Sequence, residues 1–274
     1  MTDILEVTIL GCGSSGGVPR LGGADNAGDW GACDPGNPKN RRTRCSMLAR
    51  RRSSAGETTV LVDTSPDMRQ QLLDARCASL DGVLITHDHA DQVNGLDDLR
   101  MVAMHMRKRV DVHTDASAME GLMARFGYCF VQAEGSSYPS ICNLHEIHEP
   151  FEPFTIRGEG GSVPVLAFGQ THGHIRSLGF RFGQLAYSSD VNGLNEAAFA
   201  ALEGVECWIV DTLRYTPHPS HAHLEQALGW IAHVKPRRAI LTNLHVDLDY
   251  DTLKRELPPG VEPAYDGMKI ELPI

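Results

Sequence analysis

Short apolar segments with strand-like alternation recur along this chain, and segments with a helical repeat lie between them. Residues 5–10 alternate apolar and polar positions and are rich in β-forming types, so we expect the first strand there. The same reasoning predicts further extended segments at 43–48, 58–62, 82–85, 110–113, 145–154, 163–168, 177–182, 184–187, 207–210, 239–242 and 268–272. Helices are expected at 67–73, 96–105, 116–126, 197–202, 224–233 and 251–256. Strands that alternate with helices in this way predict an α/β fold.

Two connections between these elements have informative compositions. Residues 11–36 contain many glycines and few helix or strand formers, and a loop of this length is usually functional or disordered. Residues 50–56, which begin with Arg50, Arg51 and Arg52, are expected to turn the chain between two paired strands. Because no short repeat and no clear linker interrupts the pattern, residues 1–274 are expected to form a single domain.

The most informative segment is the run from His87 to Gln92, which directly follows the apolar strand at 82–85. Two imidazoles, those of His87 and His89, can reach one metal ion when the chain turns sharply after the strand. The carboxylate of Asp91 lies two residues further on and can reach a second ion. Isolated charge is costly in a packed core, so a metal site explains this cluster better than a buried polar segment does.

Other polar side chains also follow predicted strands. Asp190, Asp211 and His245 each lie shortly after an apolar strand, and His172 follows the segment at 163–168. Sites in layered α/β folds gather at the ends of strands, so these residues can form one cluster.

The complete set of ligands is sufficient for two divalent ions. One ion would take His87, His89 and His172, the second would take Asp91, Gln92 and His245, and Asp190 would bridge them. Two such ions can hold a hydroxide nucleophile and neutralise a phosphate in the transition state. Manganese and zinc are both candidates. The amide of Gln92 is a weaker ligand than imidazole for zinc-like ions, so the second site is expected to be altered and weak.

Composition narrows the class of protein further. The formal net charge of −10 argues against a general nucleic-acid surface, which is normally basic. Seven scattered cysteines, without a Cys-x-x-Cys pair, suit a reducing cytoplasm better than a disulfide framework. No apolar run approaches the ~20 residues of a transmembrane helix, so we expect a cytoplasmic protein that does not contact the membrane.

The order and spacing of these motifs resemble the metallo-β-lactamase superfamily, and within it the branch of phosphoribosyl 1,2-cyclic phosphate phosphodiesterase and the tRNA 3′-processing endonucleases. The resemblance implies a four-layer αββα sandwich of two mixed β-sheets. Gln92 stands where the family has a third histidine. The segments that carry the resemblance are 11–19, 42–46, 87–92, 95–100, 188–190 and 243–250.

The resemblance also implies roles for individual residues. His221 matches the histidine that protonates the leaving oxygen, a step that phosphodiester cleavage needs because an alkoxide leaves poorly. Asp91 is assigned to catalysis as well as to the metals, and Asp63 is expected to orient His87 or His89. The substrate phosphate is expected to contact Ser14, Ser15, Arg42 and Ser188. Ser220 is expected to cap the helix at 224–233.

These observations predict a metal-dependent phosphodiesterase that cleaves a small cyclic or nucleotide-like phosphodiester through attack of a metal-bound hydroxide. One alternative is a tRNA 3′-processing endonuclease, against which the acidic net charge argues. Another is a nucleotide-binding protein whose catalysis is weak because Gln92 has altered the second metal site. The oligomeric state stays open between a monomer and a homodimer.

Overall fold

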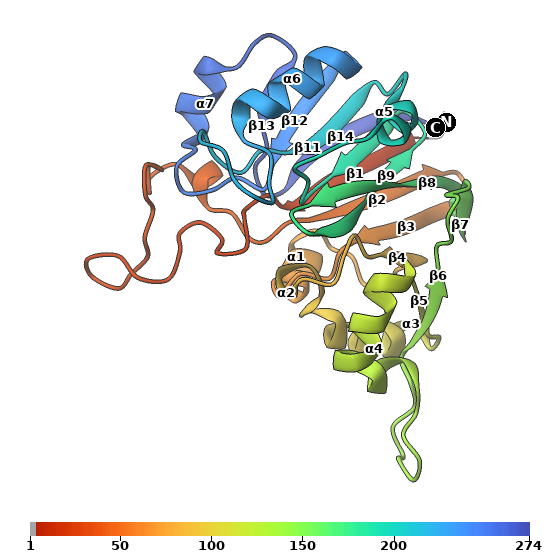
Figure 1. The fold of residues 1–274 in the computed structure, drawn as a ribbon. Helices are drawn as coiled ribbons and strands as arrows, with labels where there is room; N and C mark the ends of the chain where they lie inside the picture. The colour runs from red at the N-terminus through yellow and green to blue at the C-terminus, as the bar shows by residue number, and fades with distance from the viewer. Residues whose placement is uncertain (1–3) are drawn as a thin grey trace. The chain divides into compact units, whose positions relative to one another are not determined.

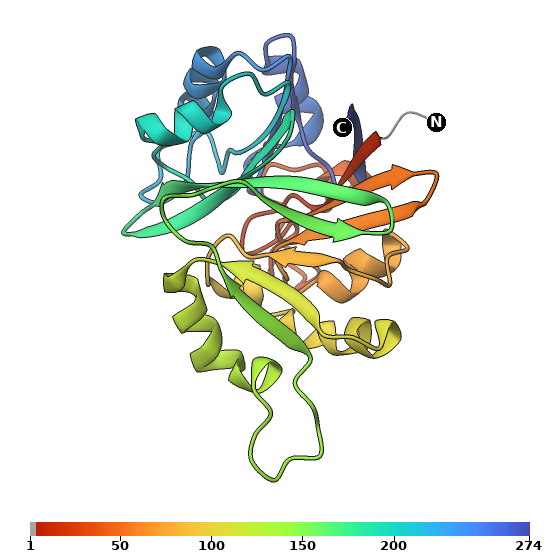
Figure 2. The ribbon, with the colours of Figure 1, turned by 90° about the vertical axis from the view of Figure 1, so that its right-hand side faces the viewer.

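The computed structural model describes residues 4–274, which divide into two compact units (Figures 1 and 2). The described part of unit 1 comprises residues 4–8, 46–164 and 269–274, and unit 2 comprises residues 9–45 and 165–268. The strands form two seven-stranded sheets.

The first sheet has the strand order β14-β1-β2-β3-β4-β5-β6. Strands β2 and β3 form an antiparallel hairpin, whereas β3, β4, β5 and β6 run parallel, so the sheet is mixed. The carboxyl ends of the parallel strands therefore share one edge, and the segment that contains His87 begins there. The strands are β1 (Ile4–Gly11), β2 (Ser46–Ser53), β3 (Gly56–Val62), β4 (Gly82–Leu84), β5 (Val110–Thr114), β6 (Cys142–Glu146) and β14 (Met268–Pro273).

The described residues of unit 1 contain four α-helices, of which α4 is the longest. Asp115 caps α4, because its side chain accepts a hydrogen bond from the Ala118 amide. The sheet side of α1 buries Met68 and Leu72, and that of α3 buries Leu99 and Val102. The helices are α1 (Met68–Asp74), α2 (Ala90–Val93), α3 (Leu99–Met106) and α4 (Ala116–Phe130), and a short 3₁₀ helix, η2 (Leu96–Asp98), precedes α3.

The second sheet has the strand order β13-β12-β11-β10-β9-β8-β7. Strands β8, β9 and β10 are antiparallel neighbours, whereas β10, β11, β12 and β13 run parallel. The strands are β7 (Phe154–Gly158), β8 (Gly161–His172), β9 (Ile175–Phe182), β10 (Leu185–Ser188), β11 (Cys207–Asp211), β12 (Arg238–Thr242) and β13 (Val261–Pro263).

The core of unit 2 lies between the parallel strands and three helices. Trp208 and Leu241 from the sheet pack with Leu202, Ile231 and Leu253 from the helices, and all five side chains are buried. Burial of apolar surface at this scale is the main stabilising contribution in such a layer. The helices are α5 (Glu196–Leu202), α6 (Leu224–Val234), α7 (Tyr250–Glu256) and the 3₁₀ helix η1 (Pro38–Asn40).

The predicted α/β class with two mixed sheets is confirmed, and three local predictions are wrong. Arg50 and Arg52 continue strand β2 rather than turn it, since both pair with residues of β3 and with Glu6. The expected strand at 145–154 is divided between β6 and β7. Helix α6 begins after His223, so Ser220 is not its cap.

The long loop at 11–36 packs against the segment that follows β12. Val18, Cys33 and Val246 form a small buried cluster, with Trp30 packed against it. Arg41 lies over the Trp30 ring, 5.2 Å from its centroid. Within residues 4–274, every helix is too short or too polar to cross a bilayer.

Candidate metal centre

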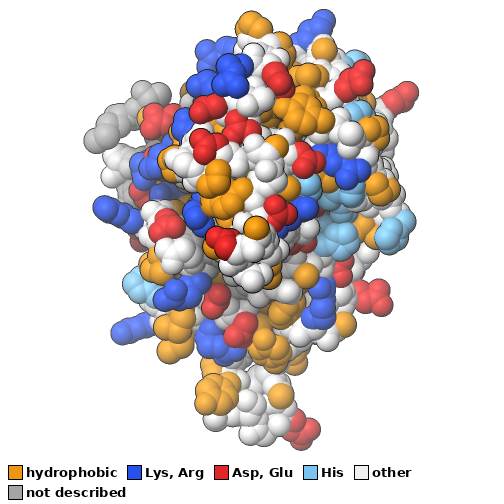
Figure 3. All heavy atoms as spheres, turned by 90° about the vertical axis from the view of Figure 1, so that its left-hand side faces the viewer, with side chains coloured by type: hydrophobic (Ala, Val, Ile, Leu, Met, Phe, Trp, Pro, Cys, Tyr) orange, Lys and Arg blue, Asp and Glu red, His pale blue; other side chains and the backbone are white. Residues whose placement is uncertain are grey.

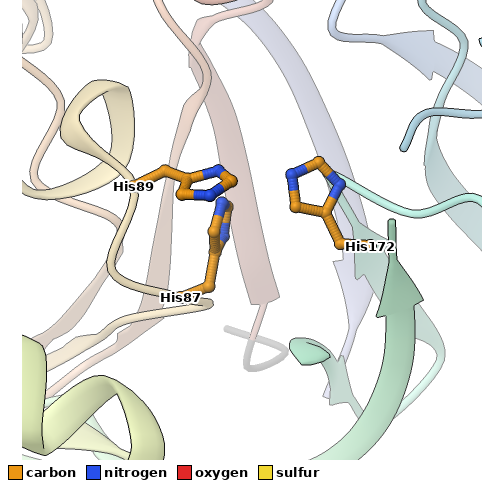
Figure 4. A group of neighbouring side chains, drawn as sticks. All are labelled: His87, His89 and His172. Atoms are coloured by element: carbon orange, nitrogen blue, oxygen red, sulfur yellow. The ribbon is translucent and has the colours of Figure 1, made fainter. Parts of the chain in front are cut away.

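The segment after β4 presents the predicted histidine cluster of unit 1 (Figure 4). Strand β4 is buried, and the chain turns after Ile85 into the short helix α2, which His89 precedes in extended conformation. The rings of His87 and His89 meet edge to face with centroids 4.5 Å apart. His87 is buried and His89 is exposed. The two imidazoles therefore lie side by side at the end of a rigid strand, as a shared cation requires.

A buried carboxylate acts on His87 through a hydroxyl group. Asp63 is fully buried, and it accepts hydrogen bonds from the Thr86 amide at 2.8 Å and the Thr86 hydroxyl at 3.0 Å. The Thr86 hydroxyl also lies 3.0 Å from His87 Nδ1. Because that hydroxyl gives its proton to the carboxylate, it accepts from His87 Nδ1–H. The lone pair of a neutral His87 ring then lies on Nε2, which is the atom that would bind a cation.

Gln92 is fully buried and held by both its backbone and its side chain. Its carbonyl accepts a hydrogen bond from the Thr64 amide at 2.8 Å. Its side-chain Nε2 donates to Asp91 Oδ2 at 3.4 Å. With the nitrogen turned to the carboxylate, the amide oxygen is the atom that Gln92 would offer to a hard cation.

In unit 2, His172 and Asp190 face each other across the ends of two strands. His172 ends β8 (Figure 4), and its Nδ1 lies 2.6 Å from the Ser220 carbonyl oxygen. A carbonyl only accepts, so Nδ1 carries the proton and the lone pair lies on Nε2. That Nε2 is 3.9 Å from Asp190 Oδ1, and both side chains are almost fully buried. Asp190 has a left-handed backbone with φ of 53°, a strained conformation that clusters at functional sites.

His221 completes this group and has its own carboxylate partner. One ligand atom each from His172, Asp190 and His221 lies within 4.8 Å of the others. Nδ1 of His221 is 2.9 Å from Asp211 Oδ2 and 3.0 Å from Asn243 Nδ2. A bond between an imidazole N–H and a carboxylate is charge-assisted and stronger than one to a neutral amide, so we assign the Nδ1 proton to the Asp211 bond.

Asp211 is fully buried, and a backbone amide as well as the His221 ring contacts its carboxylate. Its Oδ2 also accepts a hydrogen bond from the Val191 amide at 2.9 Å. Its Oδ1 is buried and has no hydrogen-bond partner among residues 4–274. A buried carboxylate oxygen in this position is costly unless a water or a cation completes its shell, which fits a polar ligand at the site.

His245 lies outside this three-residue group. Its Nδ1 is 3.0 Å from Asp247 Oδ2, and its side chain is partly buried. Burial, reinforced by Arg20, lowers the pKa of His245. A lowered pKa favours the neutral ring, which is the form that binds metals.

The four predicted substrate contacts have different environments. Ser14 is buried, and its hydroxyl has no hydrogen-bond partner among residues 4–274, whereas Ser15 is exposed. Ser188 is fully buried, and its hydroxyl accepts a hydrogen bond from Trp208 Nε1 at 3.0 Å. This bond ties Ser188 to the neighbouring strand β11, and its contact with a phosphate stays a prediction.

Arg42 has structural partners within unit 2, and its contact with a phosphate stays a prediction. Its guanidinium is buried and donates to the carbonyl oxygens of His245 at 3.2 Å and Leu248 at 2.7 Å, and to Asn40 Oδ1. These bonds fix the segment that carries His245. Basic residues elsewhere mix with acidic ones on the face in Figure 3, where several histidine side chains gather.

Sequence reasoning left the Thr86 hydroxyl and the Ser220 carbonyl out of the predicted site. It placed Asp211 in the cluster of strand-end residues but gave it no role, and the contact with His221 now suggests one. Asn243, whose side-chain nitrogen lies 3.0 Å from His221 Nδ1, directly follows the buried strand β12, and that position is a signal that could have identified it. A backbone carbonyl such as that of Ser220 leaves no signal in a sequence.

These residues place the chain in a known class of enzymes. Residues 58–243 match the model of the beta-lactamase superfamily domain, which is more than half of the chain. The chain therefore belongs to this superfamily and has the metallo-β-lactamase fold of a metal-binding hydrolase, as the motifs predicted.

Individual relatives are similar over nearly the whole chain. The crystal structure of a new diphosphatase from the PhnP family is 29% identical, with a TM-score of 0.86, and covers 99% of this chain and 98% of its own. Zinc-bound PqqB from Methylobacterium extorquens is 18% identical, with a TM-score of 0.70 over 97% of this chain and all of its own, and shows the fold alone.

Curated sequences add a longer relative. An octanoyltransferase of Porphyromonas gingivalis is 32% identical over 270 residues, which is 97% of this chain and 51% of the relative. This chain spans about half the length of the curated relatives that it matches.

Proposed function

We propose that this protein is a metal-dependent phosphodiesterase that cleaves a small cyclic or nucleotide-like phosphodiester. The observation that carries the proposal is the group of His172, Asp190 and His221, in which a carboxylate and two imidazoles converge and a further buried carboxylate holds His221. Membership of the hydrolase superfamily and the likeness to a PhnP-family diphosphatase support this class of substrate.

The residues fit divalent cations. His87 and His172 each give the Nδ1 proton to an oxygen of the protein, so each neutral ring has its lone pair on Nε2. We propose that His87, His89 and His172 would hold one ion and that Asp91, Gln92 and His245 would hold the other, with Asp190 as a further ligand. When bound, such cations lower the pKa of a coordinated water and neutralise phosphate charge. Imidazole and carboxylate ligands suit zinc and manganese alike.

The residues of this chain supply the proton for the leaving group. Asp211 accepts the Nδ1 proton of His221. This bond stabilises the imidazolium form and leaves the Nε2 proton available for transfer. As the bond between phosphorus and the leaving oxygen breaks, Nε2 donates its proton to that oxygen. His221 ends the step as a neutral imidazole that is still held by Asp211. Ser14 is the proposed contact for a phosphate oxygen, since its buried hydroxyl has no partner among the described residues.

The altered position at Gln92 favours a second candidate, a nucleotide-binding protein with weak catalysis. The amide nitrogen of Gln92 donates a hydrogen bond to Asp91, which is another proposed ligand of the same ion. If that metal site stays empty because its affinity is too low, the protein would bind a phosphate group at the remaining residues and hydrolyse its ligand only slowly.

The first test combines metal content with turnover on one sample. Protein purified without chelator or nickel affinity resin is examined by elemental mass spectrometry and assayed with bis(p-nitrophenyl) phosphate. We expect about two metals per chain and turnover that a chelator abolishes. One metal or fewer, with no turnover after added manganese or zinc, would reject the phosphodiesterase in favour of the binding protein.

Matched variants locate the activity. His221→Gln should lose activity on an alkyl phosphodiester, whereas His223→Gln, two residues away and assigned no role, should keep it. Hydrolysis of p-nitrophenyl octanoate is measured in parallel, because the P. gingivalis relative bears the name of an acyltransferase. Acyl ester cleavage that exceeds phosphodiester cleavage would contradict the proposal.

A further inference from the structure

Helices α1 and α3 of unit 1 border a groove that none of the predicted site residues lines. The groove has a volume of about 310 Å³. The buried Leu72 and Val102 and the exposed Leu73 and Met101 form its apolar surface, and Arg69, Asp98 and His105 also line it. Leu73 is 57% exposed and Met101 is 65% exposed. Adjacent exposed apolar side chains mark binding surfaces more often than scattered ones do, and methionine adapts its shape to varied ligands.

A second, charged cavity adjoins the groove. It has a volume of about 760 Å³, and Cys77 and Ala78 line both the cavity and the groove. Arg76, Lys108 and Arg157 contribute positive charge to its wall. The groove is therefore the more apolar of the two hollows and the cavity the more highly charged. Both volumes fall within the ~300–1,000 Å³ of small-molecule sites.

Some charged side chains in this cavity have partners of opposite charge and others do not. Glu57 binds Arg52 at 2.9 Å, and Asp81 accepts from the Thr59 amide at 2.9 Å and faces Lys108 at 3.8 Å. Two of the three carboxylates in the wall are thus matched by partners, and Glu159 is the third. Arg50, Arg76, Lys108 and Arg157 line the same wall, so basic residues exceed acidic ones by one. The Arg76 side chain is exposed and makes no hydrogen bond or ion pair within residues 4–274, although its backbone amide donates to the Leu73 carbonyl at 3.0 Å. The cavity consequently presents a cation to an incoming anion, on a chain whose net charge is −10.

The backbone of Arg76 adds to this picture. Arg76 follows the last turn of α1 with φ of 50°, a left-handed conformation in which glycine is the usual residue. Arg107 has the same conformation at the end of α3, with φ of 56°, but it does not line the cavity. The two arginines share backbone geometry and helix-end position and differ in their access to the cavity, so they form a matched pair for experiment.

We propose that the groove and the cavity form one binding site for an amphipathic anion, a linear aliphatic chain of medium length with a single anionic head group. The chain would lie along Leu73 and Met101, and the head group would face Arg76. The more highly charged cavity and the more apolar groove select this occupant over a purely polar or a purely apolar one. The site is separate from the proposed phosphodiesterase residues and does not depend on them.

Titration calorimetry on the full chain tests the proposal with hexanoate, octanoate and decanoate, each below its micelle concentration. Each added methylene that enters the groove should raise the affinity about fourfold. Decyl phosphate is compared with decanoate to identify the head group. Decanol, which lacks the charge, should bind about tenfold more weakly than decanoate.

Two pairs of variants locate the binding. Arg76→Ala should weaken decanoate binding about tenfold, whereas Arg107→Ala should leave it unchanged. Met101→Ser should weaken binding, whereas Met104→Ser, on the same helix and 63% exposed but outside the groove, should not. Circular dichroism and thermal melting confirm that each variant folds.

Three results would overturn the proposal. The first is an affinity that is independent of chain length or equally reduced by both members of a pair. The second is a change of molar mass in light scattering with Met101→Ser, which would make the groove an interface with a second copy. The third is binding to anionic vesicles that Met101→Ser and Met104→Ser reduce alike, which would make this face a membrane contact.

Discussion

Replacing Asp211 by asparagine isolates the contribution of one buried carboxylate to the proposed proton donor. In the native chain, Asp211 Oδ2 lies 2.9 Å from His221 Nδ1 and 2.9 Å from the Val191 amide nitrogen. Asparagine has nearly the same shape, so its oxygen can keep the bond to Val191. Its neutral amide cannot stabilise an imidazolium, and an amide nitrogen turned to Nδ1 would move the imidazole proton to Nε2.

The size of the effect follows from the strength of the lost bond. A hydrogen bond to a charged group contributes about 1.5–3 kcal/mol, which corresponds to about 10- to 150-fold in a rate that depends on it. We expect Asp211→Asn to lower kcat by that factor for a phosphodiester with an alkoxide leaving group. For bis(p-nitrophenyl) phosphate the loss should be much smaller, because p-nitrophenolate leaves without a proton.

The assay compares the two substrates over pH 5–9, with metal content measured on each sample. Asp111→Asn is the matched control, since Asp111 lies 2.8 Å from His145 Nε2 in an exposed Asp–His pair that has no predicted role. This control should retain native rates. Equal losses on both substrates, or a loss that follows metal content, would refute the assignment of Asp211 to proton donation and make it a ligand-positioning or structural residue.

Three further predictions follow from neighbouring contacts. Thr86→Val breaks the link from Asp63 to His87 and should lower metal affinity about 10- to 100-fold in competition with a chelator, and an unchanged affinity would show that the link does not orient the ring. Gln92→His should raise activity if the second site has degenerated, and lower it if the amide is a working ligand of a harder cation. Burial raises the pKa of Asp266 from 3.8 to about 6, so this group favours folding most below pH 3.8 and that contribution is lost as pH rises through 6. Urea unfolding of Asp266→Asn should therefore show a pH dependence between 4 and 7 that differs from the native one by about 3 kcal/mol, and parallel curves would contradict the raised pKa.

Residue pattern predicted much of the fold, because burial repeats along the chain. Strands β4, β11 and β12 are short and fully or almost fully buried. Asp211 is the last residue of β11, and His87 and His245 lie three residues after the ends of β4 and β12. The positions of His87, Asp211 and His245 were thus predictable from strand ends alone. Their individual roles were not, because a strand end specifies a place and not a partner.

The errors have physical causes that a one-dimensional pattern does not contain. Arg50 and Arg52 look like a turn by polarity, yet their long side chains reach Glu6 and keep the residues in strand β2. Ser220 looks like a helix cap because it precedes an amphipathic segment, yet α6 begins only after His223.

The partner of Nδ1 separates the proposed roles of three histidines that are chemically identical in the sequence. His172 gives its Nδ1 proton to a backbone carbonyl, and His87 gives its proton to a hydroxyl that is itself bound to Asp63. In both residues an oxygen atom accepts the Nδ1 proton, so the lone pair of the neutral ring lies on Nε2, where a cation can bind. His221 instead meets the Asp211 carboxylate directly, at 2.9 Å, and a charge at that distance favours the imidazolium. The same side chain is therefore prepared as a ligand in two places and as a proton donor in the third, and the substitution that exchanges these roles is the one at Asp211.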